Sequence, residues 1–228
     1  MSGGTALAQH IDLTTADGRR RARRELVWGD HGFLRYRFRN LHRISDEMYR
    51  ANQPSPEHIA RYAKELGLKT IINLRGTSAK GYYLLEKEAC ARHGISLVDF
   101  QMFSREIPSP EAVLEAKRLF DSIAYPALMH CKSGADRAGI MAVLYIHFRK
   151  GLPIREAIEQ LSFKYLHIRH GKTGVLDFYF ATYLAEGEPK GLSFTEWVTQ
   201  GYDRAALKAH FLKSRKWKLN VDQLLRRE

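Results

Sequence analysis

The stretch that decides the fold is residues 126–145, PALMHCKSGADRAGIMAVLY. Its first five residues form a short run in which only His130 is not apolar, which is typical of a buried strand, and the residues from Gly139 onward have the apolar content of a buried helix. Between them lies a turn of small and polar residues that opens at Cys131 and ends at Arg137. The stretch therefore predicts a strand, a tight turn and a helix in direct succession.

Such a turn is suited to binding an anion. Successive backbone N–H groups can point inward as an anion-binding nest, and the following helix adds its unpaired N–H groups and the positive end of its dipole. Gly134 permits a backbone conformation that a side chain would block. Arg137 offers a planar fork that matches two phosphate oxygens. The residues predicted to bind phosphate are Lys132, Ser133, Gly134, Ala135 and Arg137.

Cys131 stands at the mouth of this turn. A cysteine next to a helix N-terminus and a cation is favoured as a thiolate, which is the nucleophilic form. A thiolate beneath an anion-shaped cradle can displace a group at phosphorus through a phosphocysteine intermediate. We therefore expect Cys131 to be a catalytic nucleophile.

Helices alternate with short apolar strands around this stretch. We expect strands at residues 48–51, 69–74, 95–100 and 126–130, helices at 55–66, 84–91, 109–123 and 140–149, and further helices at 154–161, 175–184, 194–200 and 204–214. The alternation predicts an α/β fold with a central, mostly parallel sheet of about four to five strands flanked by helices. In such sheets ligands bind at the carboxyl ends of the strands, and Cys131 lies at one of those ends.

Composition narrows the class of protein. The 228 residues are 44% hydrophobic and 27% charged, a length and composition that fit one globular domain with extensions. No run approaches 18 apolar residues, and the N-terminus lacks the pattern of a secretory signal. The two cysteines, Cys90 and Cys131, are too few for a disulfide framework and fit a reducing compartment, with Cys90 expected in the core. We expect a cytoplasmic protein.

The net charge of +12 is uneven along the chain. Residues 1–44 hold nine basic against four acidic residues, residues 189–228 again nine against four, and residues 45–188 only nineteen against seventeen. We expect three regions: a basic and partly disordered N-terminal extension (1–44, with 1–18 disordered), a catalytic domain (45–188) and a basic helical C-terminal extension (189–228). The basic ends indicate either peripheral contact with an anionic inner membrane surface or a solvated fringe; nucleic acid is not an expected partner.

Residues 33–39, FLRYRFR, interleave aromatic residues with arginine. Such a run can lie at a lipid interface or clamp a phosphorylated polymer. The favoured interpretation is an edge element that packs its aromatic residues on the domain while the arginines face water.

The turn and its flanks resemble a known signature. His130 and Cys131, then five residues and Arg137, preceded by a hydrophobic strand and followed by Gly139 and a helix, resemble the motif of the protein-tyrosine/dual-specificity phosphatase superfamily. The resemblance covers about residues 45–185 and is closest to the bacterial dual-specificity-like and the tensin-type lipid phosphatases. A basic loop at residues 164–172 stands where these families have a loop that borders the active site.

This resemblance implies an activity and a set of roles. It implies metal-independent hydrolysis of phosphomonoesters, without a cofactor, on phosphotyrosine or dual-specificity protein substrates or on phosphorylated lipids or inositols. Cys131 would be the nucleophile, and Arg137 would hold the phosphate and stabilise the transition state. Lys132 would either add positive charge at the rim or face solvent, and His130 would orient the loop and tune Cys131.

Two departures from the family pattern leave the general acid open. The residue after the arginine is Ala138, where the superfamily usually has a hydroxyl that helps the thiolate leave. The loop at residues 101–108 lacks the usual Asp. The candidates are Asp136, which occupies a position used by some lipid phosphatases of this superfamily, then Glu106 on the expected loop, and Asp99, which can instead anchor structure.

Other functions compete with this one. Ala138 and the missing Asp favour, as an alternative, a catalytically weak phosphate-binding adaptor, and RNA 5′-phosphatase activity is a further option. A sulfurtransferase fits poorly, because the turn ends in an arginine suited to tetrahedral anions. The ten histidines show no metal-ligand spacing with the cysteines, so no metal site is expected.

Overall fold

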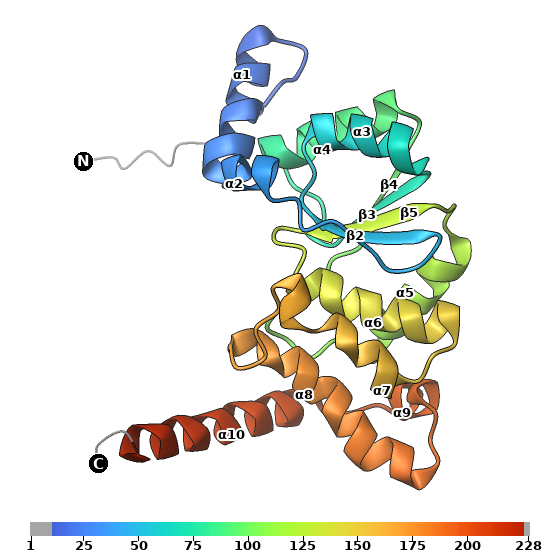
Figure 1. The fold of residues 1–228 in the computed structure, drawn as a ribbon, viewed down its shortest axis with the longest axis vertical. Coiled ribbons are helices and arrows are strands. Elements are labelled where there is room, and N and C mark those ends of the chain that lie inside the picture. The colour runs from blue at the N-terminus through green and yellow to red at the C-terminus, as the bar shows by residue number, and fades with distance from the viewer. Residues whose placement is uncertain (1–10, 226–228) are drawn as a thin grey trace, which may run out of the picture. The chain divides into compact units, whose positions relative to one another are not determined.

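The computed structural model describes residues 11–225, with side chains through residue 214. The strands are β1 His42–Arg43, β2 Met48–Asn52, β3 Thr70–Asn73, β4 Ser96–Asp99 and β5 Ala127–Cys131. The α-helices, labelled where space allows in Figure 1, are α1 Ala16–Arg24, α2 Gly32–Arg37, α3 Pro56–Leu66, α4 Gly81–Arg92, α5 Pro110–Ser122, α6 Asp136–Lys150, α7 Ile154–Ala157, α8 Val175–Thr182, α9 Phe194–Gln200 and α10 Arg204–Leu225. Short π and 3-10 turns extend some of them, such as Glu25–Gly29 after α1 and Tyr183–Gly187 after α8.

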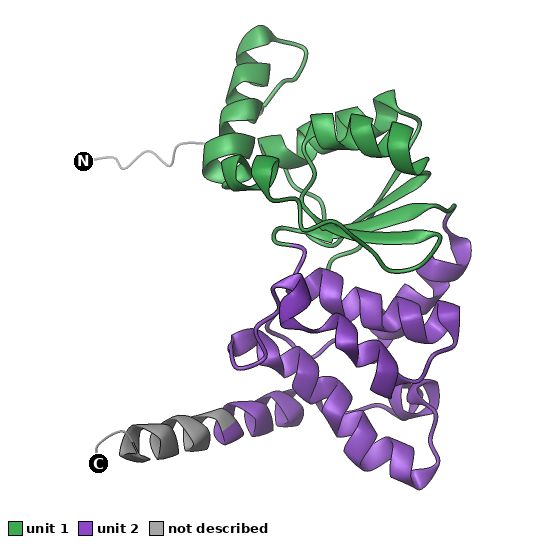
Figure 2. Cartoon of the chain, viewed as in Figure 1, with its two compact units in different colours: residues 1–101, 124–133 green, residues 102–123, 134–228 purple. Residues whose placement is uncertain are grey.

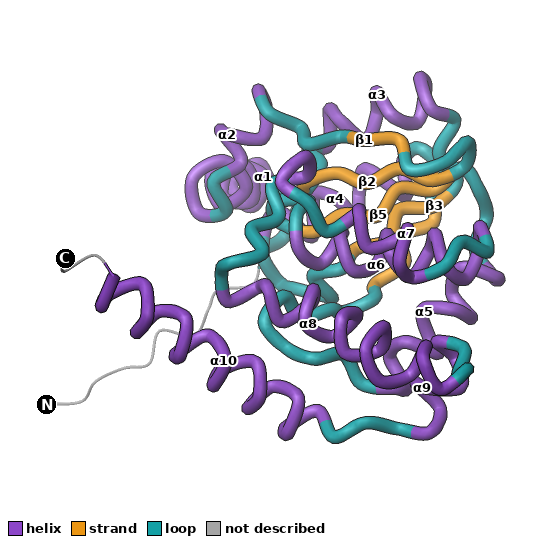
Figure 3. Tube along the Cα trace, turned by 60° about the horizontal axis from the view of Figure 1, so that its bottom comes forward, coloured by secondary structure: helices purple, strands orange, loops and turns teal. Residues whose placement is uncertain are grey.

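The five strands form one sheet in the order β1-β2-β5-β3-β4, shown in orange in Figure 3. Only β1 runs antiparallel to its neighbour, and the other pairs are parallel. Asn52 lies opposite Cys131, and Asn73 lies opposite both His130 and Asp99. The predicted α/β fold, with a mostly parallel sheet flanked by helices, is confirmed, and it places Cys131 at the carboxyl edge of the sheet.

The chain divides into two compact units, coloured separately in Figure 2: residues 1–101 with 124–133, and residues 102–123 with 134–228. The first unit holds the whole sheet. Helices α3 and α4 pack on it through a core that includes Ile59, Tyr62, Ile71 and Leu128. Cys90 belongs to this core, as predicted, and burial raises the pKa of its thiol to about 12.

The N-terminal helices are an integral part of the first unit. Ala22 and Leu26 form a small core with Leu85 of α4. Gly81 makes this close packing possible, because a Cβ there would lie 2.5 Å from the Ala22 backbone. The Glu25 carboxylate accepts a hydrogen bond from the Gly81 N–H (2.8 Å), so it caps the positive end of α4.

Part of the expected N-terminal disorder is wrong. Residues 1–10 lie outside the described part of the chain, but α1 begins at Ala16, within the segment that was expected to be disordered. The Thr15 hydroxyl accepts a hydrogen bond from the Gly18 N–H (3.0 Å) and caps the helix. A local cap and the packing of Ala22 outweigh the polar composition of the segment.

The favoured interpretation of residues 33–39 is also wrong. Three of its apolar side chains are exposed, Phe33 by 42%, Leu34 by 59% and Phe38 by 54%, whereas Arg35 is buried. The reason is that Arg35 finds the carboxylate of Asp30 in the interior, at 2.7 Å. Together with Trp28, whose ring centroid lies 5.5 Å from that of Phe33, these side chains form an exposed apolar face.

The second unit is helical. Residues 138–146 of α6 are buried, and Phe120 of α5 packs edge-on against Tyr145. A cluster of aromatic rings joins α8, the turn Tyr183–Gly187, α9 and the loop before α10; it includes Tyr179, Tyr183, Phe194, Trp197 and Tyr202. The Tyr202 hydroxyl donates to the Pro108 carbonyl (2.8 Å) and so ties this cluster to the segment before α5. Across residues 11–225, no helix combines the length and the apolar content needed to cross a membrane.

Candidate active site

The predicted strand, turn and helix are all present in the signature stretch. Strand β5 ends at Cys131, whose side chain is buried, and α6 begins at Asp136 with Ala135 as its N-terminal cap. Gly134 adopts a positive φ of 75°, a left-handed conformation that glycine tolerates and other residues resist. This confirms the conformational role predicted for Gly134. The stretch begins in the first unit and continues into the second.

Two contacts within the first unit fix the orientation of the peptide groups after Cys131. The Lys132 carbonyl accepts from the Gln53 N–H (3.4 Å), and the Ser133 carbonyl accepts from the Asn40 side-chain amide (2.9 Å). In a trans peptide the N–H points opposite to the C=O. The amides of Ser133 and Gly134 therefore point away from Gln53 and Asn40, as an anion-binding nest requires.

Asp30 is the centre of a charged cluster beside this loop, the Asp30 node. Its buried carboxylate receives two hydrogen bonds from Arg75 (both 2.8 Å) and one from Arg35 (2.7 Å), and the Lys132 ammonium lies 3.6 Å away. Burial alone would raise the pKa of Asp30, but Arg75, Arg35 and Lys132 outweigh it and lower the pKa. Lys132 also lies 3.5 Å from the His31 imidazole, so one carboxylate and one histidine position the half-exposed lysine.

Arg75 links the Asp30 node, through Gln53 and Glu86, to His130, the residue before Cys131. Its guanidinium donates to the Gln53 side-chain oxygen (2.8 Å), and the Gln53 amide donates to Glu86 (2.7 Å). Glu86 lies 2.6 Å from His130 Nε2, with both side chains fully buried. Arg75, which closely follows β3, is thus mostly buried and bound to Asp30. His130 thus lies beside a carboxylate in the core, a position compatible with the orienting role predicted for it.

His167 forms a second charged cluster, the His167 node, in the second unit. Its fully buried imidazole contacts Asp136 through Nδ1 (2.8 Å) and Asp177 through Nε2 (2.6 Å). Burial alone would lower the pKa of His167, but hydrogen bonds to the two carboxylates and their charges raise it to about 9. At neutral pH the ring is therefore an imidazolium. The node includes Asp136, the first of the three carboxylates considered as general acid.

The other two candidates for the general acid have structural partners. Asp99 accepts a hydrogen bond on each oxygen, from the Asn73 amide (2.8 Å) and from the Tyr83 hydroxyl (2.5 Å), which suits an anchoring role. Glu106 pairs with Lys208 of α10. To donate a proton to substrate, Asp99 or Glu106 would therefore first have to break these contacts.

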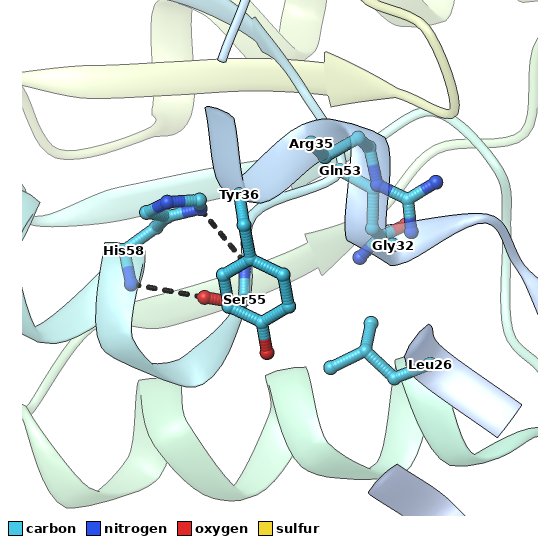
Figure 4. Close-up of a pocket in the computed structure, with 7 residues that line it drawn as sticks. All are labelled: Leu26, Gly32, Arg35, Tyr36, Gln53, Ser55 and His58. Carbon is cyan, nitrogen blue, oxygen red and sulfur yellow. Dashed lines mark hydrogen bonds between the residues drawn. The ribbon is translucent and has the colours of Figure 1, made fainter. Parts of the chain in front are cut away.

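Figure 4 shows a hollow next to the Asp30 node, lined by Leu26, Gly32, Arg35, Tyr36, Gln53, Ser55 and His58. The hollow has no room for a water molecule, so it is a packing crevice and not a substrate cavity. Its dashed contacts are the capping box of α3, in which the Ser55 hydroxyl accepts from the His58 N–H and the Ser55 N–H donates to the His58 ring.

Sequence reasoning missed Asp30, Glu86 and Asp177, and it did not find the role of His167. One signal was available: Asp177 is the single charge in the apolar run 175–180, VLDFYF, and a lone carboxylate on a buried face needs a buried partner. Asp30 carries no comparable signal, because its partners Arg35 and Arg75 are brought to it by tertiary packing.

Comparison with known proteins defines the class. The crystal structure of P. aeruginosa TpbA superposes with a TM-score of 0.52 at 18% identity, covering 75% of this chain and 90% of that one, which shows a shared fold. The core catalytic domain of the PP-IP phosphatase SIW14 from S. cerevisiae gives a TM-score of 0.49 at 18% identity, covering 67% and 92%. The family model that matches the chain describes DSP-PTPase phosphatases, so the fold is that of the protein-tyrosine/dual-specificity phosphatase superfamily.

The family itself follows from the sequence match. Residues 40–170, more than half of the chain, match the family described as PTP-NADK, DSP-PTPase phosphatase fused to NAD+ kinase, and the chain belongs to this family. The comparison with curated proteins found no match.

Proposed function

We propose that this protein is a metal-independent phosphatase that hydrolyses phosphomonoesters through a phosphocysteine formed on Cys131. The observation that carries the proposal is the orientation of the loop directly after Cys131. Gln53 and Asn40 bind the carbonyls of Lys132 and Ser133, so the N–H groups of Ser133 and Gly134 point in the opposite direction. Membership of a phosphatase family supports the same chemistry.

The remaining roles follow from the motif. Arg137, in the first turn of α6, holds two phosphate oxygens, and the loop amides of residues 132–137 stabilise the charge that develops on the transferred phosphoryl group. Asp136 protonates the leaving oxygen. Ser133, Gly134 and Ala135 contribute through their backbone, and His130 orients the loop. Lys132, half-exposed beside His31, favours substrates with a second anionic group, which include phosphorylated lipids and inositols as well as phosphoproteins.

The test is phosphate release in the presence of a chelator, first from an aryl phosphate and then across phosphopeptides, phospholipids and inositol phosphates. We expect Cys131→Ser to lower kcat/KM by roughly 1,000-fold or more, because the covalent route is lost. Cys90→Ala is the matched control, since Cys90 is a buried core cysteine in the first unit. Full activity in Cys131→Ser overturns the proposal. Tight binding of phosphorylated ligands without turnover in the wild type would instead support the adaptor alternative that Ala138 motivates.

We further propose that the exposed apolar face of residues 28–38 contacts an anionic membrane surface. Trp28 is 67% exposed and stands beside Phe33, and arginines that include the exposed Arg23, Arg24 and Arg37 flank the face. Apolar side chains that insert between acyl chains, combined with cations that bind anionic headgroups, are the features of interfacial segments.

Vesicle sedimentation tests this contact. We expect binding to phosphatidylcholine vesicles that contain 30% phosphatidylglycerol, weak binding to pure phosphatidylcholine, and a loss of at least ~10-fold in affinity for Trp28→Ser combined with Leu34→Ser. Phe163→Ser, which alters an exposed aromatic residue of the second unit, is the control. Equal binding by the double variant, or binding only to a protein partner, contradicts the membrane proposal.

A further inference from the structure

The His167 node is an ordered acid–base array whose role the sequence did not reveal. His167 lies in the loop before α8, Asp136 in the first turn of α6, and Asp177 in the first turn of α8. The His167 side chain is fully buried, so in this structure the two carboxylates, and not bulk water, receive its N–H groups. Three segments of the second unit therefore meet at a single ring.

The contacts define the charge of the node. A neutral imidazole can donate from only one nitrogen, whereas both nitrogens of His167 contact carboxyl oxygens, so with both carboxylates ionised each nitrogen carries a proton. The pKa of about 9 for His167 agrees with this geometry. The charged groups that bear on the ring are Asp136 from α6, Asp177 from α8, and Arg169, whose Nε donates to the second oxygen of Asp177 (2.9 Å).

The two carboxylates are not equivalent. Asp177 is shared between His167 and Arg169 and is nearly buried, so its negative charge is fully used in holding the two cations. Asp136 is 23% exposed and is directly followed by Arg137. Asp177 therefore fixes the ring, whereas Asp136, which precedes the phosphate-binding Arg137, is the partly exposed carboxylate of the node.

We propose that His167 is the positioning residue and proton store for Asp136, supplying through Nδ1 the proton that Asp136 delivers to the leaving oxygen. This inference rests on the proposed phosphatase function. When the bond from Cys131 Sγ to phosphorus forms and the P–O ester bond breaks, His167 passes its Nδ1 proton to the Asp136 carboxylate, which gives it to the departing alkoxide and is a carboxylate again. The ring is then neutral and stays hydrogen-bonded to Asp177.

The second half of the reaction restores the array. A water molecule attacks phosphorus and loses a proton to Asp136, which returns it to His167, while the S–P bond breaks and its electron pair stays on sulfur. The net reaction is ester and water giving alcohol and phosphate, with no other reactant. Storing the proton on a buried imidazolium lets Asp136 act as an acid at neutral pH even though a carboxyl group alone is ordinarily ionised there.

Leaving-group dependence tests the proposal in the full chain. A good leaving group such as p-nitrophenolate needs little protonation, whereas phenolate and an alkoxide need it. We expect His167→Asn and Asp136→Asn to lower kcat/KM on phenyl phosphate and on an alkyl phosphate by about 100-fold or more, and on p-nitrophenyl phosphate by less than about 10-fold. A purely structural role would lower all three alike, and that result, or no loss on any substrate, overturns the proposal.

Two further variants sharpen the test. His93→Asn changes an exposed histidine at the end of α4, in the first unit, and should leave the three activities unchanged. Asp177→Asn removes one carboxylate from the ring, so the activity on phenyl phosphate should fall at a lower pH than in the wild type, because the imidazolium loses part of its stabilisation. Thermal unfolding of each variant identifies any that fail to fold.

A direct titration makes the inference independent of turnover. In the Cys131→Ser protein, the NMR signals of the His167 ring should report a protonated imidazole up to about pH 9, and Asp136→Asn should move that transition to lower pH. Titration of His167 near its ordinary value overturns the inference even if the phosphatase is active. Conversely, activity in Cys131→Ser, or no turnover by the wild type, would refute the proposed function while the titration still decides the state of His167.

Discussion

The two charged nodes of the molecule are built with opposite signs at the centre. In the Asp30 node one buried carboxylate is surrounded by two arginines and a lysine. In the His167 node one buried imidazolium is held between two carboxylates. The first lies beside the start of the signature loop, at Lys132, and the second includes Asp136 at its end.

The two nodes therefore differ in whether their cations can release a proton. Arginine does not lose its proton in proteins, so the Asp30 node can orient groups but cannot transfer a proton through Arg35 or Arg75. An imidazolium can give up its proton and take it back near physiological pH. We therefore expect the Asp30 node to act as a structural clamp and the His167 node to contribute through a charge that depends on pH, and three predictions test these expectations.

The largest effect is expected from removing the centre of the first node. Asp30→Ala leaves Arg35 and Arg75 with no carboxylate in a mostly buried site, and breaking such a cluster typically costs about 3–5 kcal/mol. Urea unfolding followed by circular dichroism measures the loss. Asp46→Ala, at an almost fully exposed ion pair with Arg43, is the control and should leave stability unchanged. A loss for Asp30→Ala no larger than that of the control would show that the node is not a structural clamp.

The two nodes should also lose their contributions to stability at opposite ends of the pH scale. The folded pKa of His167 is raised from 6.5 to about 9, so its contribution is complete below about pH 6.5 and is lost as pH rises through 9. The folded pKa of Asp30 is lowered from 3.8, so its contribution is complete above about pH 4 and is lost as pH falls through the folded value.

Unfolding of wild type, His167→Asn and Asp30→Asn across pH checks this prediction. The wild-type advantage over His167→Asn should be roughly 3 kcal/mol at most near neutrality and should shrink in alkali, whereas the advantage over Asp30→Asn should shrink in acid. A pH-independent difference for either variant would show that the charge of that group does not contribute.

The smallest effect is expected at the outer edge of the second node. Arg169 donates to Asp177, but its side chain is 62% exposed, so Arg169→Gln should cost less than about 1 kcal/mol in the same urea assay. Arg75→Gln, at a mostly buried arginine of the other node, is the matched comparison and should cost clearly more. Equal losses would mean that exposure does not distinguish the two arginines.

Most of the fold was predictable because it depends on local patterns. The alternation of apolar strands and amphipathic helices gave four of the five strands, and the Ser-Pro-Glu sequences gave the starts of α3 and α5. The two-residue strand β1 and the helices α1 and α2 were missed. Their stability depends on contacts such as Gly81 with Ala22, which are distant in sequence and leave no periodic signal.

The candidate site was predictable only where the chain is contiguous. The strand, the glycine turn and the helix around Cys131 lie within one short stretch, so spacing alone indicates their arrangement. The partners of that stretch come from elsewhere: Asp30 from the N-terminal segment, Glu86 from α4 and His167 from the loop before α8. Pairing between such positions is decided by packing, and a single sequence does not reveal it.

The location of Asp30 has a practical consequence for how this protein is cut into fragments. The family match begins at residue 40, downstream of the aspartate that neutralises Arg75 and lies next to Lys132. A recombinant fragment limited to the matched residues would keep Cys131 and Arg137 but would leave Arg75 and Lys132 without the Asp30 carboxylate. A fragment intended for assays should therefore include Asp30, because residues 40–170 alone leave out the counter-charge of Arg75 and Lys132.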